Sequence, residues 1–281
     1  MIDYSEVDVE RALNLTSIDL GEYVINPYKG CAYGCLYCYV RSNKTSLRSA
    51  RLWGSYVEIR ANIINLLEEE LIAQKPTCVL LGSTTECFQP VEQKYGLTKR
   101  ILEVLNKYKV SYVILTRSPL IQDCISLLQS GFCKKVYFSV NDFSPELKIA
   151  LEPKSPSFES RFQAIKELSK HGIEVVPYVC PVLPAITDVA RIFDLYSGMK
   201  VIDFEGLNFN LKNIQDIVDA INLFYPHLKE NYLKMLVDDA FYEKIWKDMQ
   251  TEILTRSREH NKDCHVFIHP FGEYFKNSYL V

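Results

Sequence analysis

Hydrophobic positions along the chain follow two alternating patterns. Short apolar runs rich in β-branched residues predict strands, and longer stretches with an apolar residue at every third or fourth position predict helices. The expected strands are 23–27, 78–83, 110–116, 135–140, 174–180 and 206–211. The expected helices are 57–73, 97–108, 119–130, 157–171, 188–198, 213–223 and 238–258.

Strands that alternate with helices predict parallel pairing through right-handed crossovers. Six such units favour an α/β fold built as a partial (β/α)6 TIM-type barrel over a closed eight-fold barrel. No long linker, low-complexity tract or repeat divides the chain. We therefore expect one main domain over 1–235, with a short lead-in at its start, and an α-rich C-terminal extension over 236–281 that packs on the barrel.

The amino-acid composition argues against several classes of protein. With 281 residues, 48% of them hydrophobic, it is long enough to bury a substantial core. Its 32 lysines and arginines against 35 acidic residues lack the positive excess of a typical nucleic-acid-binding domain. No apolar run approaches the roughly 18–20 residues of a membrane helix, and the acidic start MIDYSEVDVE is unlike a signal peptide. These features predict a cytoplasmic protein that does not enter a membrane.

Three of the nine cysteines lie close together in the sequence. Cys31, Cys35 and Cys38 are separated by three and then two residues, so one irregular loop can bring three thiolates to three corners of an iron–sulfur cluster. Gly30 and Gly34 permit the tight backbone that such wrapping needs. The loop contains no fourth cysteine, which leaves one iron open to a small-molecule ligand. It also follows the first expected strand, at the end where β/α barrels form active sites.

Other interpretations of these cysteines stay open. In the first, they are core residues, although a core does not require two neighbouring glycines. In the second, they bind structural zinc, with a distant fourth ligand from Cys264, His265 or His269 and no catalysis. In the third, they hold a saturated electron-transfer cluster, with Cys264 or another distant cysteine as the fourth ligand. Metal analysis distinguishes iron with sulfide from zinc.

The segment from Asn26 to Tyr39, with its Asn-Pro-Tyr-x-Gly-Cys and Cys-x-Tyr-Cys-Tyr elements, resembles the radical S-adenosylmethionine (SAM) superfamily. Within this superfamily it resembles the spore photoproduct lyase-like branch, also called DNA repair photolyase-like. Further segments match it in order at 84–92, 116–118 and 151–161. The resemblance covers about residues 20–215.

This resemblance implies a radical SAM enzyme, lyase-like, with a 4Fe–4S cluster ligated by Cys31, Cys35 and Cys38 and with SAM on the open iron. It implies reductive cleavage of SAM to a 5′-deoxyadenosyl radical, which abstracts hydrogen from a substrate. The electron comes from an external one-electron reductant of the flavodoxin or ferredoxin type. Nucleic acid is the substrate class implied by the branch, although the near-neutral charge argues against it.

Polar residues that follow the expected strands are the cofactor contacts implied by the resemblance. Thr85 and Glu86, after the second strand, are expected at the SAM amino group. Arg117, after the third strand, stands where the family has lysine and is expected at the SAM carboxylate. Ser139 and Asn141, at the end of the fourth strand, are expected at the ribose. The competing interpretation for these residues is an ordinary turn or strand cap.

Three more residues are expected nearer to the chemistry. By resemblance Tyr37 flanks the adenine and Tyr39 faces the substrate, although either ring can simply pack in the core. True spore photoproduct lyases place a hydrogen-donating cysteine near the positions of Ser83 and Thr84, which are not thiols here. Cys87 is the candidate that replaces it, provided that its thiol reaches the cavity.

Overall fold

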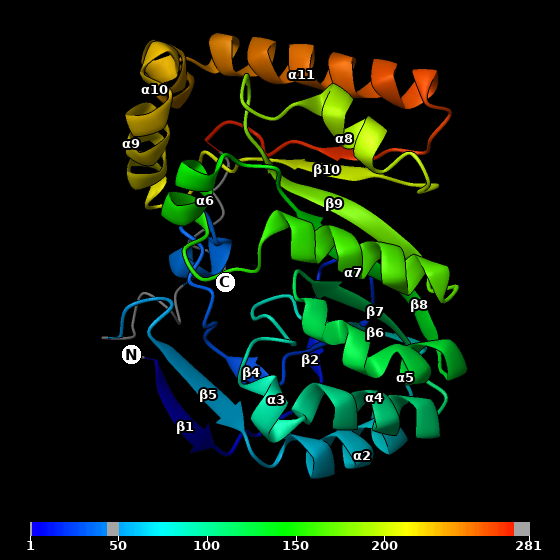
Figure 1. The fold of residues 1–281 in the computed structure, drawn as a ribbon. Coiled ribbons are helices and arrows are strands. Elements are labelled where there is room, and N and C mark those ends of the chain that lie inside the picture. The colour runs from blue at the N-terminus through cyan, green and yellow to red at the C-terminus, as the bar shows by residue number, and fades with distance from the viewer. Residues whose placement is uncertain (1, 44–50, 273–281) are drawn as a thin grey trace. The chain divides into compact units, whose positions relative to one another are not determined.

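The computed structural model describes residues 2–43 and 51–272 (Figure 1). The chain divides into two compact units, each described separately. Unit 1 consists of Met1–Gly34, Arg51–Ser139 and Ser155–Val176, and unit 2 consists of Cys35–Ala50, Val140–Lys154 and Pro177–Val281. The chain passes from one unit to the other within the cysteine loop, directly after Gly34.

Unit 1 is built on parallel strands. Strands β3 (Tyr23–Ile25), β6 (Cys78–Leu81), β7 (Ser111–Thr116) and β8 (Cys133–Val140) pair in parallel in that order, and β2 (Asn14–Leu15) adds an antiparallel edge. Because alternate strand residues point to opposite faces, one face carries a fully buried apolar set of side chains: Val79, Leu81, Tyr112, Ile114, Val136 and Phe138. The four strands predicted from short apolar runs in this part of the chain are confirmed.

Helices cover the strands of unit 1, and Figure 1 shows α4, α5 and α7 in front of β6, β7 and β8. They are α2 (Ile63–Gln74), α3 (Glu92–Tyr95), α4 (Leu97–Lys107), α5 (Ile125–Ser130) and α7 (Phe158–Lys170), with a 3-10 helix over Pro119–Cys124 before α5. The start of α7 is stabilised by the Ser157 side chain, which accepts a hydrogen bond from the Ser160 amide. This capping agrees with the predicted helix 157–171.

A second, smaller sheet in unit 1 corrects one prediction. Strand β5 (Tyr56–Arg60) pairs in parallel with β1 (Asp3–Val7) and antiparallel with β4 (Tyr28–Lys29). The predicted helix 57–73 was therefore wrong over its first turn, and the lead-in contains a strand. The cause is non-local pairing: the β-branched Val57 and Ile59 continue the apolar pattern of α2, but their partners lie far away in sequence.

Unit 2 contains the rest of the parallel strands. β10 (Asp203–Gly206) pairs with β9 (Val175–Val182) and with β11 (Val266–Phe267). The predicted strand 206–211 was misplaced, because the backbone leaves the sheet at Gly206, where a side chain would collide with the Trp246 ring. Residues 207–211 are mostly buried without forming a strand, and their apolar residues Leu207, Phe209 and Leu211 face the core.

The helices of unit 2 are α6 (Pro145–Leu151), α8 (Val189–Leu195), α9 (Ile214–Phe224), α10 (Lys229–Val237) and α11 (Asp239–Glu259), together with short 3-10 helices over Tyr39–Ser42 and Pro226–Leu228. α10, which was not predicted, packs between α9 and α11. The Phe193 ring of α8 lies 5.6 Å from the Phe204 ring of β10, so α8 covers one face of the strands.

Parallel strands alternating with helices make this a mixed α/β fold typical of a partial barrel, with helices in the C-terminal part, as predicted. The predicted domain boundary near residue 235 stays a prediction, and residues 273–281 of the expected extension lie outside the described part of the chain. Within the described ranges, no helix combines the length and apolar composition needed to cross a bilayer.

Candidate functional site

The first half of the cysteine loop, up to Gly34, belongs to unit 1. Strand β3 ends at Ile25, and the side-chain oxygen of Asn26 accepts a hydrogen bond from the Thr84 amide at 3.0 Å. Gly30 has a φ of +85°, and a Cβ there would lie 2.4 Å from the Tyr56 carbonyl oxygen. Only glycine fits this turn, so the backbone just before Cys31 is narrowly defined.

Two side chains from the segment after β6 hold the backbone around Cys31. The Thr85 hydroxyl donates to the Gly30 carbonyl at 2.6 Å, and the Gln89 side-chain oxygen accepts from the Ala32 amide at 2.8 Å. Gln89 Nε2 also lies 3.1 Å from Thr85 Oγ1. Thr85, Gln89 and Cys31 are buried. The loop on both sides of Cys31 is therefore tied to one short segment.

Glu86 connects the ends of two neighbouring strands of unit 1. The Thr116 hydroxyl and the Phe88 amide donate to its Oε1 at 2.6 and 3.0 Å, and the Arg117 amide donates to Oε2 at 2.9 Å. Burial raises the pKa of Glu86, although these hydrogen bonds lower it in part. The structure thus brings Glu86 and Arg117 together, while Thr85 contacts the loop.

The second half of the loop belongs to unit 2, where Tyr37 and Asn141 meet. The Tyr37 hydroxyl donates to Glu152, and Asn141 Nδ2 lies 2.9 Å from Glu152 Oε1, 3.2 Å from the Tyr37 oxygen and 2.7 Å from the Cys180 carbonyl oxygen. All three polar side chains are buried. Asn141 Oδ1 is also buried, and it has no hydrogen-bond partner within the described residues.

The backbone of this second half is held as well. The Leu36 amide donates to the Leu151 carbonyl at the end of α6, and the Asn213 side chain donates to the Leu36 carbonyl, both at 2.8 Å. Cys35 is buried and Cys38 is partly exposed. Each half of the loop is therefore anchored by side chains or backbone of its own unit.

The remaining expected site residues, Tyr39, Ser139 and Cys87, differ in how far they are buried. Tyr39 begins a 3-10 helix and is 42% exposed. Ser139 lies inside β8 and is partly exposed. Cys87 is fully buried in unit 1, and burial raises the pKa of its thiol well above the usual value. A buried neutral thiol is a poor nucleophile or metal ligand, so Cys87 resembles a core cysteine in this conformation.

A second polar cluster lies on β9 and β10 of unit 2. Glu205 accepts hydrogen bonds from the Tyr178 hydroxyl at 2.5 Å, the Cys180 thiol at 3.1 Å and His269 Nε2 at 2.9 Å. Burial alone would raise the pKa of Glu205, but hydrogen bonds from His269 and Tyr178 outweigh it and lower the pKa. His269, considered above as a zinc ligand, is thus engaged by a carboxylate.

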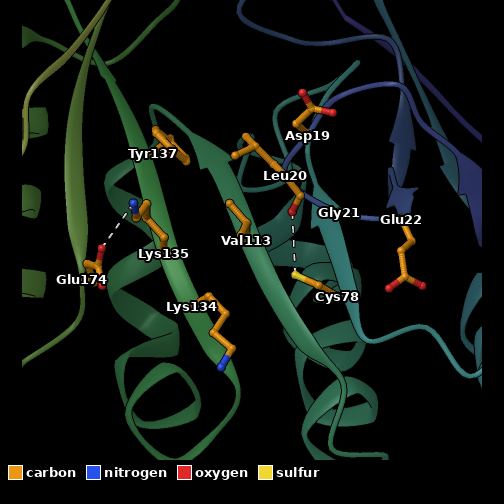
Figure 2. A pocket seen from close by; sticks show the side chains of 10 residues that line it. All are labelled: Asp19, Leu20, Gly21, Glu22, Cys78, Val113, Lys134, Lys135, Tyr137 and Glu174. Atoms are coloured by element: carbon orange, nitrogen blue, oxygen red, sulfur yellow. Dashed lines mark hydrogen bonds and ion pairs between the residues drawn. The ribbon is translucent and has the colours of Figure 1, made fainter. Parts of the chain in front are cut away.

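A pocket of about 550 Å³ opens near the amino-terminal ends of the unit 1 strands. Figure 2 shows Glu22, Cys78 and Lys135 around it, with the apolar side chains of Leu20 and Val113 between them. These residues precede or begin β3, β6 and β8, and Val113 lies near the start of β7. The loop follows the carboxyl end of β3, so this pocket lies away from it.

Comparison with known proteins identifies the family. A model of the radical SAM superfamily matches residues 25–195, more than half of the chain. The chain belongs to the radical SAM superfamily. A protein of Methanocaldococcus jannaschii without an assigned function is 32% identical over 82% of this chain and 84% of its own length. A functionally unassigned protein of Mycobacterium tuberculosis is 28% identical over 70% of this chain and 61% of its own length.

Several solved structures have a similar fold. Spore photoproduct lyase complexed with dinucleoside spore photoproduct has a TM-score of 0.65 at 15% identity, covering 95% of this chain and 82% of that chain. Streptococcus suis SuiB bound to precursor peptide SuiA has a TM-score of 0.55 at 15% identity, covering 86% and 48%. At such identities the likeness concerns the fold alone. It confirms the expected architecture.

A radical SAM enzyme uses a 4Fe–4S cluster and SAM, and the loop has the donor set for the cluster. Three cysteines, two of them buried, lie in a loop that glycines shape and buried side chains hold. Within the described ranges, no three His, Cys, Asp or Glu side chains converge as on a single metal ion. A 4Fe–4S cluster does not need that convergence, because each cysteine ligates a different iron.

The unit 2 contacts also fit SAM. Asn141 Oδ1 is a buried acceptor without a partner in the described chain, and such an atom is unfavourable unless a ligand or water donates to it. A ribose hydroxyl or an adenine amino group supplies such a donor. The sequence predicts Asn141 and Tyr37 as cofactor contacts, and this stays a prediction. It did not assign Gln89 or Glu152 to the site, because their only sequence signal is their place in the matching segments 84–92 and 151–161.

Proposed function

We propose that this radical SAM enzyme cleaves SAM reductively and uses the resulting radical to remove a hydrogen atom from its substrate. Cys31, Cys35 and Cys38 hold the cluster and leave one iron open for the amino and carboxylate groups of SAM. When bound, the cluster supplies one electron to SAM, which yields methionine and a 5′-deoxyadenosyl radical. The observation that carries this proposal is the cysteine loop, whose halves are each tied to a buried hydrogen-bond network.

The residues of this chain bind and orient SAM. Tyr37 offers a ring, held through Glu152, on which adenine can stack. Asn141 offers its unpartnered oxygen to the nucleoside, and Ser139 lies two residues earlier on the same strand end. Arg117, a partly exposed residue that follows β7, is the proposed partner of the SAM carboxylate.

Thr85 and Glu86 are the proposed neighbours of the SAM amino group. Both follow β6, and Glu86 is a buried carboxyl group with three donors already aimed at it. A cationic ammonium beside it would favour its ionised form. Tyr39, which is exposed, and Cys87, which is buried, are the proposed residues on the substrate side, and Cys87 needs a local opening to act there.

The substrate and the partners of the reaction are further proposals. An external one-electron reductant of the flavodoxin or ferredoxin type delivers the electron, in a cytoplasmic setting. Nucleic acid is the substrate class that we test first, because the fold resembles spore photoproduct lyase complexed with a dinucleoside photoproduct. The peptide-bound SuiB has a similar fold, so a peptide is the second class to test.

Anaerobic reconstitution with iron and sulfide, followed by dithionite and SAM, tests the proposal. We expect 5′-deoxyadenosine by chromatography, and its loss in Cys31→Ala, Cys35→Ala and Cys38→Ala. The matched control is Cys264→Ala, a partly exposed cysteine outside the loop, which is expected to retain the cluster and the activity. Loss of the cluster in Cys264→Ala would favour a saturated electron-transfer site, and zinc in place of iron would reject the enzyme proposal.

A further inference from the structure

Gln89 is a fully buried residue whose side-chain amide reaches the backbone on both sides of Cys31. Its Oε1 accepts from the Ala32 amide at 2.8 Å, while its Nε2 lies 3.1 Å from Thr85 Oγ1 and 3.5 Å from the Gly30 carbonyl oxygen. We propose that Gln89 and Thr85 are positioning residues that hold Cys31 in the conformation that ligates the cluster. This role rests on the proposed function of the loop.

The chemistry of the two backbone groups explains why an amide stands at position 89. The Ala32 N–H needs an acceptor and the Gly30 carbonyl needs donors, and both lie in a buried part of the loop. A glutamine side chain carries an acceptor oxygen and a donor nitrogen on one rigid plane. A carboxylate provides only acceptors at neutral pH and an aliphatic side chain provides neither. An aliphatic side chain therefore leaves the buried Ala32 N–H without its acceptor, and a carboxylate places a second acceptor oxygen against the Gly30 carbonyl and the Thr85 oxygen.

Thr85 completes the arrangement. Its hydroxyl donates to the Gly30 carbonyl at 2.6 Å and accepts from Gln89 Nε2, so its donor and one of its two acceptor lone pairs are used inside the protein. Gly30 itself has a φ of +85°, a backbone conformation that other residues rarely adopt. The backbone on both sides of Cys31 is therefore held by the Gly30 turn, the Thr85 hydroxyl and the Gln89 amide.

The segment that carries Thr85 and Gln89 is itself held in place on both sides. Glu86 binds the Thr116 hydroxyl and the Arg117 amide at the end of β7. Glu92 accepts a hydrogen bond from the Tyr28 hydroxyl, two residues before Gly30. Because the segment is fixed to β7 and to β4, it acts as a rigid support for the loop. Outer partners of this kind orient metal ligands, and removing them typically lowers metal affinity about 10- to 100-fold.

The test compares single variants after anaerobic reconstitution. Gln89→Leu removes both hydrogen-bonding groups, Gln89→Glu retains only acceptors, and Thr85→Val removes the hydroxyl with little change in shape. Thr85→Ser retains the hydroxyl and serves as the rescue variant. Gln93→Leu is the matched control, because Gln93 is exposed and lies four positions further along the same segment.

Three readouts are measured: the rate at which a chelator removes iron, the electron paramagnetic resonance spectrum of the reduced cluster with and without SAM, and the thermal unfolding of the metal-free chain. We expect iron to be lost about 10-fold faster or more in Gln89→Leu and Thr85→Val. We also expect an altered spectrum in these two variants. Thr85→Ser and Gln93→Leu should match the wild type, and a merely structural role would change the unfolding of the metal-free chain without changing the spectrum.

The outcomes separate this role from the proposed function. Retention of iron and an unchanged spectrum in Gln89→Leu would overturn the positioning role while leaving the enzyme proposal intact. If Gln89→Leu does not fold, the pair Thr85→Val and Thr85→Ser decides, since equal behaviour of the two also overturns it. A wild-type chain that takes up no iron would reject the proposed function and this role with it.

Discussion

Tyr37 donates its phenolic hydrogen to the carboxylate of Glu152, which lies 115 positions further along the chain. Tyr37 stands between the second and third cysteines of the loop, and Glu152 directly follows α6. Both side chains are buried, so neither group can exchange this partner for bulk water. The conformation of the cysteine loop in unit 2 therefore depends on where α6 ends.

Removing this contact tests that dependence. Tyr37→Phe retains the ring but removes the donor, and it leaves a buried carboxylate with one fewer hydrogen bond. We expect the free energy of unfolding to fall by about 1–3 kcal/mol, measured by urea denaturation of the metal-free chain. Tyr95→Phe in α3, a partly exposed tyrosine, is the control and is expected to change it by less than about 0.5 kcal/mol. Equal effects of the two variants would show that the Tyr37 contact contributes nothing specific.

The buried Asn141 Oδ1 atom, which has no hydrogen-bond partner among the described residues, predicts the position of the SAM nucleoside. If a donor group of SAM satisfies this buried oxygen, Asn141→Leu weakens SAM binding by about 10-fold, which corresponds to roughly 1.4 kcal/mol for one lost hydrogen bond. Titration calorimetry with the reconstituted protein measures the affinity. The control is Asn14→Leu in β2, an exposed position at the sheet edge. Unchanged affinity in Asn141→Leu would place the nucleoside elsewhere and leave the unpartnered oxygen to an ordered water.

Glu205 predicts a pH dependence of stability. Its pKa in the folded chain is lowered by hydrogen bonds from His269 and Tyr178 that outweigh burial. A lowered folded pKa means that the unfolded chain binds the proton more tightly, so Glu205 stabilises the fold above its unfolded pKa of about 4.3. This contribution is lost as the pH falls through the lower folded pKa.

The measurement is urea denaturation of the wild type and Glu205→Gln between pH 7 and pH 3. We expect the difference in unfolding free energy that is present at pH 5 to shrink below about pH 4. Glu252→Gln, an exposed carboxylate on α11, serves as the control with no such trend. A difference that grows on acidification would contradict the lowered pKa.

Much of the fold could be predicted because its signals are local. The runs that became β6 and β7 are short and apolar, and the periodic stretches that became α7 and α11 begin at the capping side chains of Ser157 and Asp238. The sheet of β1, β4 and β5 escaped prediction since its strands are paired across distant parts of the sequence. Residues 57–60 look helical from their neighbours and are extended because of their partners.

The candidate site could also be predicted only in part. The cysteine spacing and the two glycines are visible in sequence because one loop contains them all. The partners of Glu86 are two backbone amides and one hydroxyl, and backbone groups carry no sequence signature. Gln89 and Glu152 reach the loop from segments more than fifty positions away, so only the folded chain reveals their roles.

Gly34 offers a test of how closely the loop is packed. Its φ of +62° is nearly that of Gly96, at +59°, so alanine meets the same backbone strain at both positions, about 1 kcal/mol. A Cβ at Gly34 would also lie 3.0 Å from the Gly54 Cα atom, whereas nothing lies within 4 Å at Gly96. We therefore expect Gly34→Ala to destabilise the chain by about 1 kcal/mol more than Gly96→Ala and to lower the iron content after reconstitution, which Gly96→Ala leaves unchanged. Thermal unfolding and iron analysis of the two variants measure these effects, and equal losses would mean that backbone strain alone, without the contact to Gly54, selects glycine at position 34.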